Sequence, residues 1–112
     1  MRYAVMICAD PNAADDLSPD EYERIVKEYL ALGDDPRTVT HGQLQPVETA
    51  TSVRVVEGKV LVTDGPFADT KEVMGGFALV DADNLDEVIE IAARIPAARM
   101  GGVVEIRPMV ER

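Results

Sequence analysis

Tryptophan is absent from this 112-residue sequence, and cysteine and histidine occur once each, as Cys8 and His41. A single cysteine excludes an intramolecular disulfide, and its apolar neighbours predict a small buried thiol in a reducing compartment. The scarce aromatic side chains offer no row of rings on which bases could stack. No basic leader opens the chain, and no stretch approaches the ~18 apolar residues of a membrane span. These absences predict a cytoplasmic protein without a membrane partner.

Basic residues are also in short supply. Eleven Lys and Arg oppose 21 Asp and Glu, so the net charge is −10. Such a chain repels phosphate backbones, which excludes nucleic acid as a partner. Metal-ligand spacings of the HxxxH or CxxC kind are missing, and Gly75-Gly76 lacks the context of a nucleotide-binding loop. We therefore expect no metal and no cofactor.

The length and composition are those of one ordinary globular domain. Hydrophobic residues make up 46% of the chain and charged residues 29%, which is enough apolar material for a core and too little chain for two domains. We treat residues 1–112 as a single folding unit.

Two amphipathic helices are predicted from their start signals. Ser18, Pro19 and Glu21 form a capping box, and Gly33 is the expected stop. Asn84 and Glu87 open the second helix in the same way, and Pro96 ends it. The apolar stripes expected to face the core are Tyr22, Ile25, Val26, Tyr29 and Leu30 in the first helix and Leu85, Val88, Ile89, Ala92 and Ala93, widened by Ile91 and Ile95, in the second.

The remaining apolar segments predict strands. They cover residues 1–9, 38–44, 51–56, 59–63, 77–80 and 103–106, and Glu57-Gly58 forms a two-residue hairpin turn between the third and the fourth. The order β-α-β-β-β-β-α-β predicts an α+β fold, a ferredoxin-like split βαβ with an extra β-hairpin.

The second face of that sheet needs a cover. Two helices cover one face, yet Ala4, Met6 and Cys8, with Ala78 and Val80, suggest apolar residues on both faces of the central strands. A second copy of the chain is the economical cover, because homodimers are the commonest oligomers. We predict a homodimer.

One segment carries a family resemblance. It begins with Val62-Thr63-Asp64-Gly65-Pro66-Phe67 and continues with Thr70-Lys71-Glu72 and Gly75-Gly76-Phe77. This segment resembles the DGPF-motif branch of the YCII-related family. The likeness extends over nearly the whole chain through Leu44-Gln45-Pro46 and Val104-Glu105-Ile106-Arg107-Pro108. Asp69 stands where that family more often has Glu. The resemblance implies a dimeric α/β barrel with a ligand site near the DGPF loop, a generally unassigned role, and for some members an association with extracytoplasmic-function sigma factors.

The same resemblance supplies site candidates. The wider superfamily is credited with a His–Asp pair, for which His41 and Asp64 are the candidates here. We predict Asp64, Phe67, Lys71 and Glu72 as ligand-binding residues. Each has a plainer interpretation: Asp64 as a turn residue, His41 as a surface or hydrogen-bonded side chain, and Lys71 and Glu72 as a solvated charge pair.

Two functional hypotheses follow. The chain is either a dimeric module that binds a small polar molecule or regulates a partner, or a cofactor-free enzyme with Asp64, assisted by His41, as general acid or base. Catalysis requires burial that raises the pKa of Asp64, whereas nearby Lys71 would lower it, so the residues favour binding at least as much as catalysis.

Overall fold

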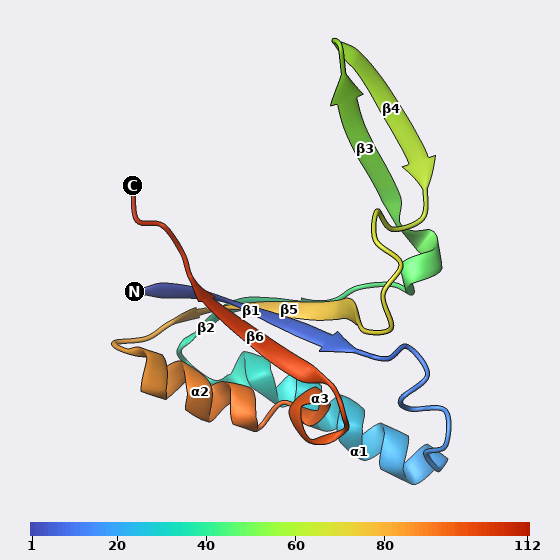
Figure 1. Cartoon of the computed structure of the whole chain (residues 1–112). Coiled ribbons are helices and arrows are strands. Elements are labelled where there is room, and N and C mark those ends of the chain that lie inside the picture. The colour runs from blue at the N-terminus through green and yellow to red at the C-terminus, as the bar shows by residue number, and fades with distance from the viewer.

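The computed structural model describes all residues from Met1 to Arg112, and its central element is a four-stranded antiparallel sheet (Figure 1). The strands lie in the order β2-β5-β1-β6, where β1 is Arg2–Ala9, β2 is Thr38–Gln43, β5 is Val73–Asp81 and β6 is Val103–Pro108. With a helix between β1 and β2 and another after β5, this is the strand order of a ferredoxin-like split βαβ. The predicted mixed α+β class is confirmed.

The helices all lie against one face of the sheet (Figure 1). They are α1 (Pro19–Leu30), α2 (Leu85–Ala93) and α3 (Pro96–Arg99), and two short 3₁₀ segments, η1 (Ala31–Asp34) and η2 (Val47–Thr49), follow α1 and β2. Both predicted caps are present, since Ser18 Oγ accepts from Glu21 N at 3.2 Å and Asn84 Oδ1 accepts from Glu87 N at 3.1 Å.

The predicted end of the first helix was wrong, whereas that of the second was confirmed. Gly33 lies inside η1 rather than stopping the first helix, because the last turn of α1 tightens into 3₁₀ geometry. Pro96 does end α2, but it also occupies the first turn of α3, a position for which its fixed φ is well suited. The sequence offered no signal for so short a helix.

The core lies between the sheet and the helices. Alternate residues Tyr3, Val5 and Ile7 of β1 point toward the helices, as do Ala78 and Val80 of the neighbouring strand. They pack against the buried side of the helical layer, which consists of Val88, Ile91, Ile95 and Ala97. This is the only face of the sheet that the chain covers, as predicted.

The opposite face of the sheet, which we call the open face, is apolar at its centre. Ala4, Met6 and Cys8 of β1 lie there half-buried. On β5, the residues that pair with Ala4 and Met6 are Leu79 and Phe77, so these two share the open face. Of the residues that suggested two apolar faces, Ala78 and Val80 belong to the helix-covered core.

The helices also leave apolar side chains uncovered. No residue of α1 is buried, and Tyr22 and Leu30 are 51% and 62% exposed. In α2, Leu85 and Ile89 are about half exposed. The predicted stripes were therefore too wide, because each helix turns only part of its apolar side toward a sheet of four strands.

The extra hairpin stands apart from this layered unit. Strands β3 (Thr51–Val56) and β4 (Lys59–Asp64) form a separate two-stranded sheet that rises on the side away from the helices (Figure 1). Glu57 and Gly58 both have positive φ, 50° and 77°, as a type I′ turn requires, which confirms the predicted turn. The radius of gyration, 15.9 Å, exceeds the ~13 Å of a compact chain of this length.

The helical layer provides a stability test. Ile91 is 1% exposed and Ile89, two residues before it, is 48% exposed. Ile91→Ala should lower the free energy of unfolding by about 2–5 kcal/mol, because it removes packed side-chain volume. Ile89→Ala should change it by no more than about 0.5 kcal/mol. Urea titration of both variants measures this, and equal losses would contradict the described core.

Candidate functional site

The loop from Asp64 to Glu72 connects the hairpin to β5 and contains the predicted ligand-binding residues. Gly65 has φ +100°, a conformation that residues with a Cβ rarely adopt. Its N–H donates to Ala50 O at 2.7 Å, and its carbonyl accepts from Ser52 Oγ at 2.7 Å. The loop is therefore fixed at its base to the start of β3.

The four predicted ligand-binding side chains of this loop are all exposed. Phe67 is the extreme case at 83%. The side-chain hydrogen bonds of the loop are made by Ser52 and by Thr70, whose hydroxyl donates to Glu72 O at 2.7 Å. Neither the Asp64 carboxylate nor the Lys71 ammonium is engaged within the chain, so both are available to an incoming group.

His41 is not brought to Asp64 within one chain. It pairs with Ala78 in β2, which places its side chain on the helix-covered face. There it lies beside η1, where a Cβ added at Gly33 would stand 2.6 Å from His41 Nε2. Asp64 ends the hairpin on the other side of the sheet (Figure 1). No hydrogen bond or ion pair joins the two.

Cys8 lies on the open face near the loop. Burial raises the pKa of the Cys8 thiol, and the carboxylates of Glu105 and Glu72 raise it further. The thiol is therefore held in its protonated form, as expected for a small packing residue rather than a nucleophile. Val73, the residue after the loop, pairs with Ala9, so the end of the loop lies beside the end of β1.

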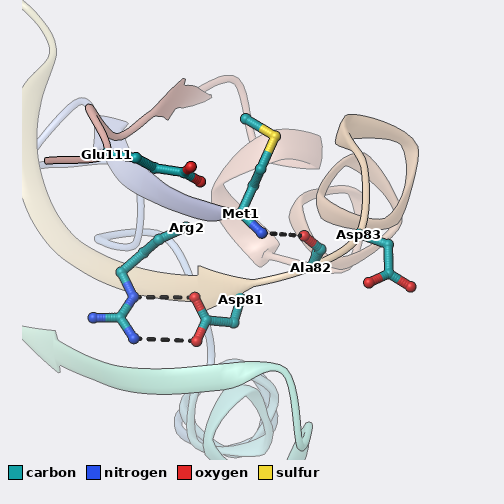
Figure 2. A pocket seen from close by; sticks show the side chains of 6 residues that line it. All are labelled: Met1, Arg2, Asp81, Ala82, Asp83 and Glu111. Atoms are coloured by element: carbon teal, nitrogen blue, oxygen red, sulfur yellow. Dashed lines mark hydrogen bonds and ion pairs between the residues drawn. The ribbon is translucent and has the colours of Figure 1, made fainter.

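One surface hollow of about 450 Å³ lies where the chain ends meet the sheet (Figure 2). Arg2 Nε and Nη2 donate hydrogen bonds to the two carboxylate oxygens of Asp81, at 3.0 and 3.1 Å. The Met1 amino group donates to Ala82 O at 3.0 Å. Asp83 and Glu111 complete its rim. The guanidinium is already occupied by Asp81, so this hollow presents mainly carboxylates.

A second hollow of about 460 Å³ separates α1 and η1 from α2 and α3. Its apolar residues are Ala31, Leu32, Ile91 and Ala93. Its charged residues pair across it, Glu28 with Arg99 and Asp35 with Arg94, the latter at 3.2 Å. These ion pairs connect α1 and η1 to the segment that contains α2 and α3, and they leave no unpaired charge in the hollow for a ligand.

Asp35 is the most strongly held ionisable group of this cleft, and sequence reasoning missed it. Its carboxylate accepts from Arg37 N, Nε and Nη2 at 2.9, 3.0 and 2.9 Å, and these bonds hold its pKa well below the usual range. The spacing Asp35-Pro36-Arg37 could have suggested the local part. Arg94, 59 positions away, could not have been foreseen.

No group of three or more His, Cys, Asp or Glu side chains lies close enough to hold a metal ion. No helix has both the length and the apolar character needed to cross a bilayer.

Comparison with known proteins settles the family. The family model described as "YCII-related domain" matches residues 1–111. The chain belongs to the YCII-related family. An uncharacterized protein of Rhizobium meliloti (strain 1021) is 34% identical to this YCII-related chain over 116 residues, which cover 97% of the chain and 92% of the relative.

A solved structure similar to this YCII-related chain is that of 5-chloro-2-hydroxyhydroquinone dehydrochlorinase from Burkholderia phenoliruptrix AC1100, in complex with 2,5-dihydroxybenzoquinone. The match covers 94% of this chain and 91% of that one, with 16% identity and a TM-score of 0.48.

The Asp35 cluster predicts a pH dependence. The folded-state pKa of Asp35 lies below the unfolded value of about 3.9, so its stabilisation is complete above that pH and is lost as the pH falls from about 4 toward the folded-state pKa. Asp35→Asn should destabilise the chain at pH 6, and the difference from wild type should shrink as the pH falls from 4 to 2. Urea midpoints across this range measure it.

Asp34→Asn is the matched control, since Asp34 is the exposed neighbour and makes no ion pair. A constant difference between Asp35→Asn and wild type from pH 6 to pH 2 would contradict the role given to the carboxylate.

Proposed function

We propose that this YCII-related chain works as a homodimeric module that binds a small, charged polar molecule at the loop from Asp64 to Glu72. The observation that carries the proposal is the free pair of opposite charges on that loop. Neither the Asp64 carboxylate nor the Lys71 ammonium has a partner in the chain, although other charges, such as those of Arg2, Asp35 and Arg94, are paired. Free, opposite charges on one loop suit a ligand that carries complementary groups.

The dimeric part of the proposal is supported by how little the chain buries alone. Only 14 of 112 residues are buried, and the exposed large hydrophobic side chains outnumber them. The open face and the hairpin account for much of this uncovered apolar surface. Apolar surface left in water is unfavourable, and association with a copy would remove part of that cost.

Binding is better supported than acid–base catalysis within one chain. A general base at Asp64 needs burial, and its own chain leaves Asp64 exposed. The assistant considered for it, His41, faces the helices. The catalytic alternative therefore depends on groups that a second subunit would have to supply.

The regulatory form of the proposal is that the ligand-bound module acts on another protein. The association with an extracytoplasmic-function sigma factor, implied by the DGPF resemblance, stays a prediction. Recovery of such a factor with a tagged chain tests it, and its absence from a pull-down of cells that contain both proteins would count against it.

Thermal-shift screening tests the ligand site. A panel of small anions, cations and zwitterions should contain compounds that raise the melting temperature of the wild-type chain, because a ligand that binds only the folded state stabilises it. Asp64→Asn should abolish the shift for those compounds, and Lys71→Met should abolish it for those with an anionic group.

Asp69→Asn is the matched control, an exposed aspartate of the same loop that the proposal leaves out. A ligand-induced shift of the same size in wild type and in Asp64→Asn would remove the loop carboxylate from the site.

A further inference from the structure

The hairpin has one face rich in valine and one face of mixed polar and apolar residues. In the ladder, Val53 lies opposite Val62, and Val55 lies opposite Val60, so these four side chains share one face. All four are 61–66% exposed. The other face is mixed, and it bears Ser52, Arg54, Val56, Lys59, Leu61 and Thr63. We call the first one the valine face. An isolated two-stranded hairpin is marginal in water, so a ribbon of this composition needs a surface to pack on.

The charge distribution favours a second copy of the chain as that surface. The chain carries a net charge of −10, so two copies repel each other except where charge is absent. In the hairpin, Arg54 and Lys59 balance Glu57 and Asp64, and the valine face itself carries no charge before Asp64. This is the part of an acidic molecule that another acidic copy can approach.

The area of the open face points the same way. Four strands spaced by about 4.8 Å, each about 20 Å long, give the open face a footprint of about 400 Å². A stable interface needs about 800 Å² from each partner. The open face alone falls short, and the hairpin, which rises from the same side of the sheet (Figure 1), is the adjoining apolar surface that can supply more.

We infer that the valine face of each hairpin packs on the other subunit of the dimer, so that the hairpin is an arm that holds its partner. The inference rests on the proposed dimeric function and extends it to the ligand site. Asp64 lies opposite Thr51 in the same ladder and follows Val60 and Val62 at every second position of β4, so it shares the valine face. The partner that covers the valines also closes over the Asp64 carboxylate, and the ligand site is complete only in the dimer.

Thiol reactivity tests the arm contact. In a Cys8→Ser background, Val62→Cys and Leu61→Cys place a single thiol on opposite faces of neighbouring positions in β4. With the purified native dimer and iodoacetamide, the thiol of Val62→Cys should react at least about tenfold more slowly than that of Leu61→Cys, because it is accessible only when the arm opens. Equal rates in a protein that keeps the dimer mass would overturn the arm contact and leave the proposed dimer standing.

A second pair tests the closure over Asp64. Thr51→Cys lies opposite Asp64 on the valine face, and Thr63→Cys lies beside it on the mixed face. We expect protection of the first thiol and free reaction of the second. If Val62→Cys is protected and Thr51→Cys is not, the arm contact holds and the closure over the ligand site is wrong.

Charged substitutions on the valine face give an independent test of the arm contact. The double variant Val55→Lys, Val60→Lys should raise the dissociation constant of the dimer at least about tenfold, because two charges would be buried in the interface. Leu61→Lys should leave that constant unchanged. Unchanged dissociation constants for the double variant would overturn the arm. Retained binding of a screened ligand by a monomeric double variant would overturn only the claim that the site is completed by the partner.

Discussion

A sheet has two faces, and the helices of this chain cover one of them (Figure 1). The covered face yields the whole core, in which Val5, Val80 and Val88 are fully buried. The other face presents Met6, Phe77 and Leu79 half-covered at best. Apolar surface removed from water contributes roughly 25 cal/mol per Å², so the uncovered face is a large stabilisation left unused by a single chain. The proposed dimer and the proposed completion of the ligand site both depend on this constraint.

The acidity of the chain acts against that association and restricts where it can occur. The carboxylates of Glu105 and Glu72 lie near the open face, and both raise the pKa of Cys8. The hairpin is the one projecting element whose charges cancel. The proposed arm extends a ribbon without net charge to the partner, so it increases the contact area without adding repulsion.

Local signals in the sequence were sufficient for most of the fold. Side-chain caps at Ser18 and Asn84 and the positive-φ turn at Glu57-Gly58 depend on neighbours within four residues, so the sequence predicts them well. Exposure is a tertiary property. Tyr22 and Ile89 occupy helical core spacing yet lie open, because the sheet beneath the helices is too narrow to meet both flanks of each stripe.

The candidate site shows the same division between features set by local sequence and features set by tertiary structure. The DGPF segment located a loop with free charges, and the motif sufficed for that because Gly65 needs its left-handed backbone wherever the chain makes this turn. Whether His41 approaches Asp64 depends on the face to which each strand turns its residues. The bulge between Thr38 and Thr40 shifts the register of β2 just before His41, and the helix-side orientation of this residue could not be inferred from its neighbours.

Sedimentation equilibrium of the unmodified chain at micromolar concentration tests the central claim most directly, which is that one chain is structurally incomplete. The account predicts a mass of twice 12.2 kDa. A stable species of 12.2 kDa would contradict it, because the open face and the valine face would then remain in water with no partner to cover them.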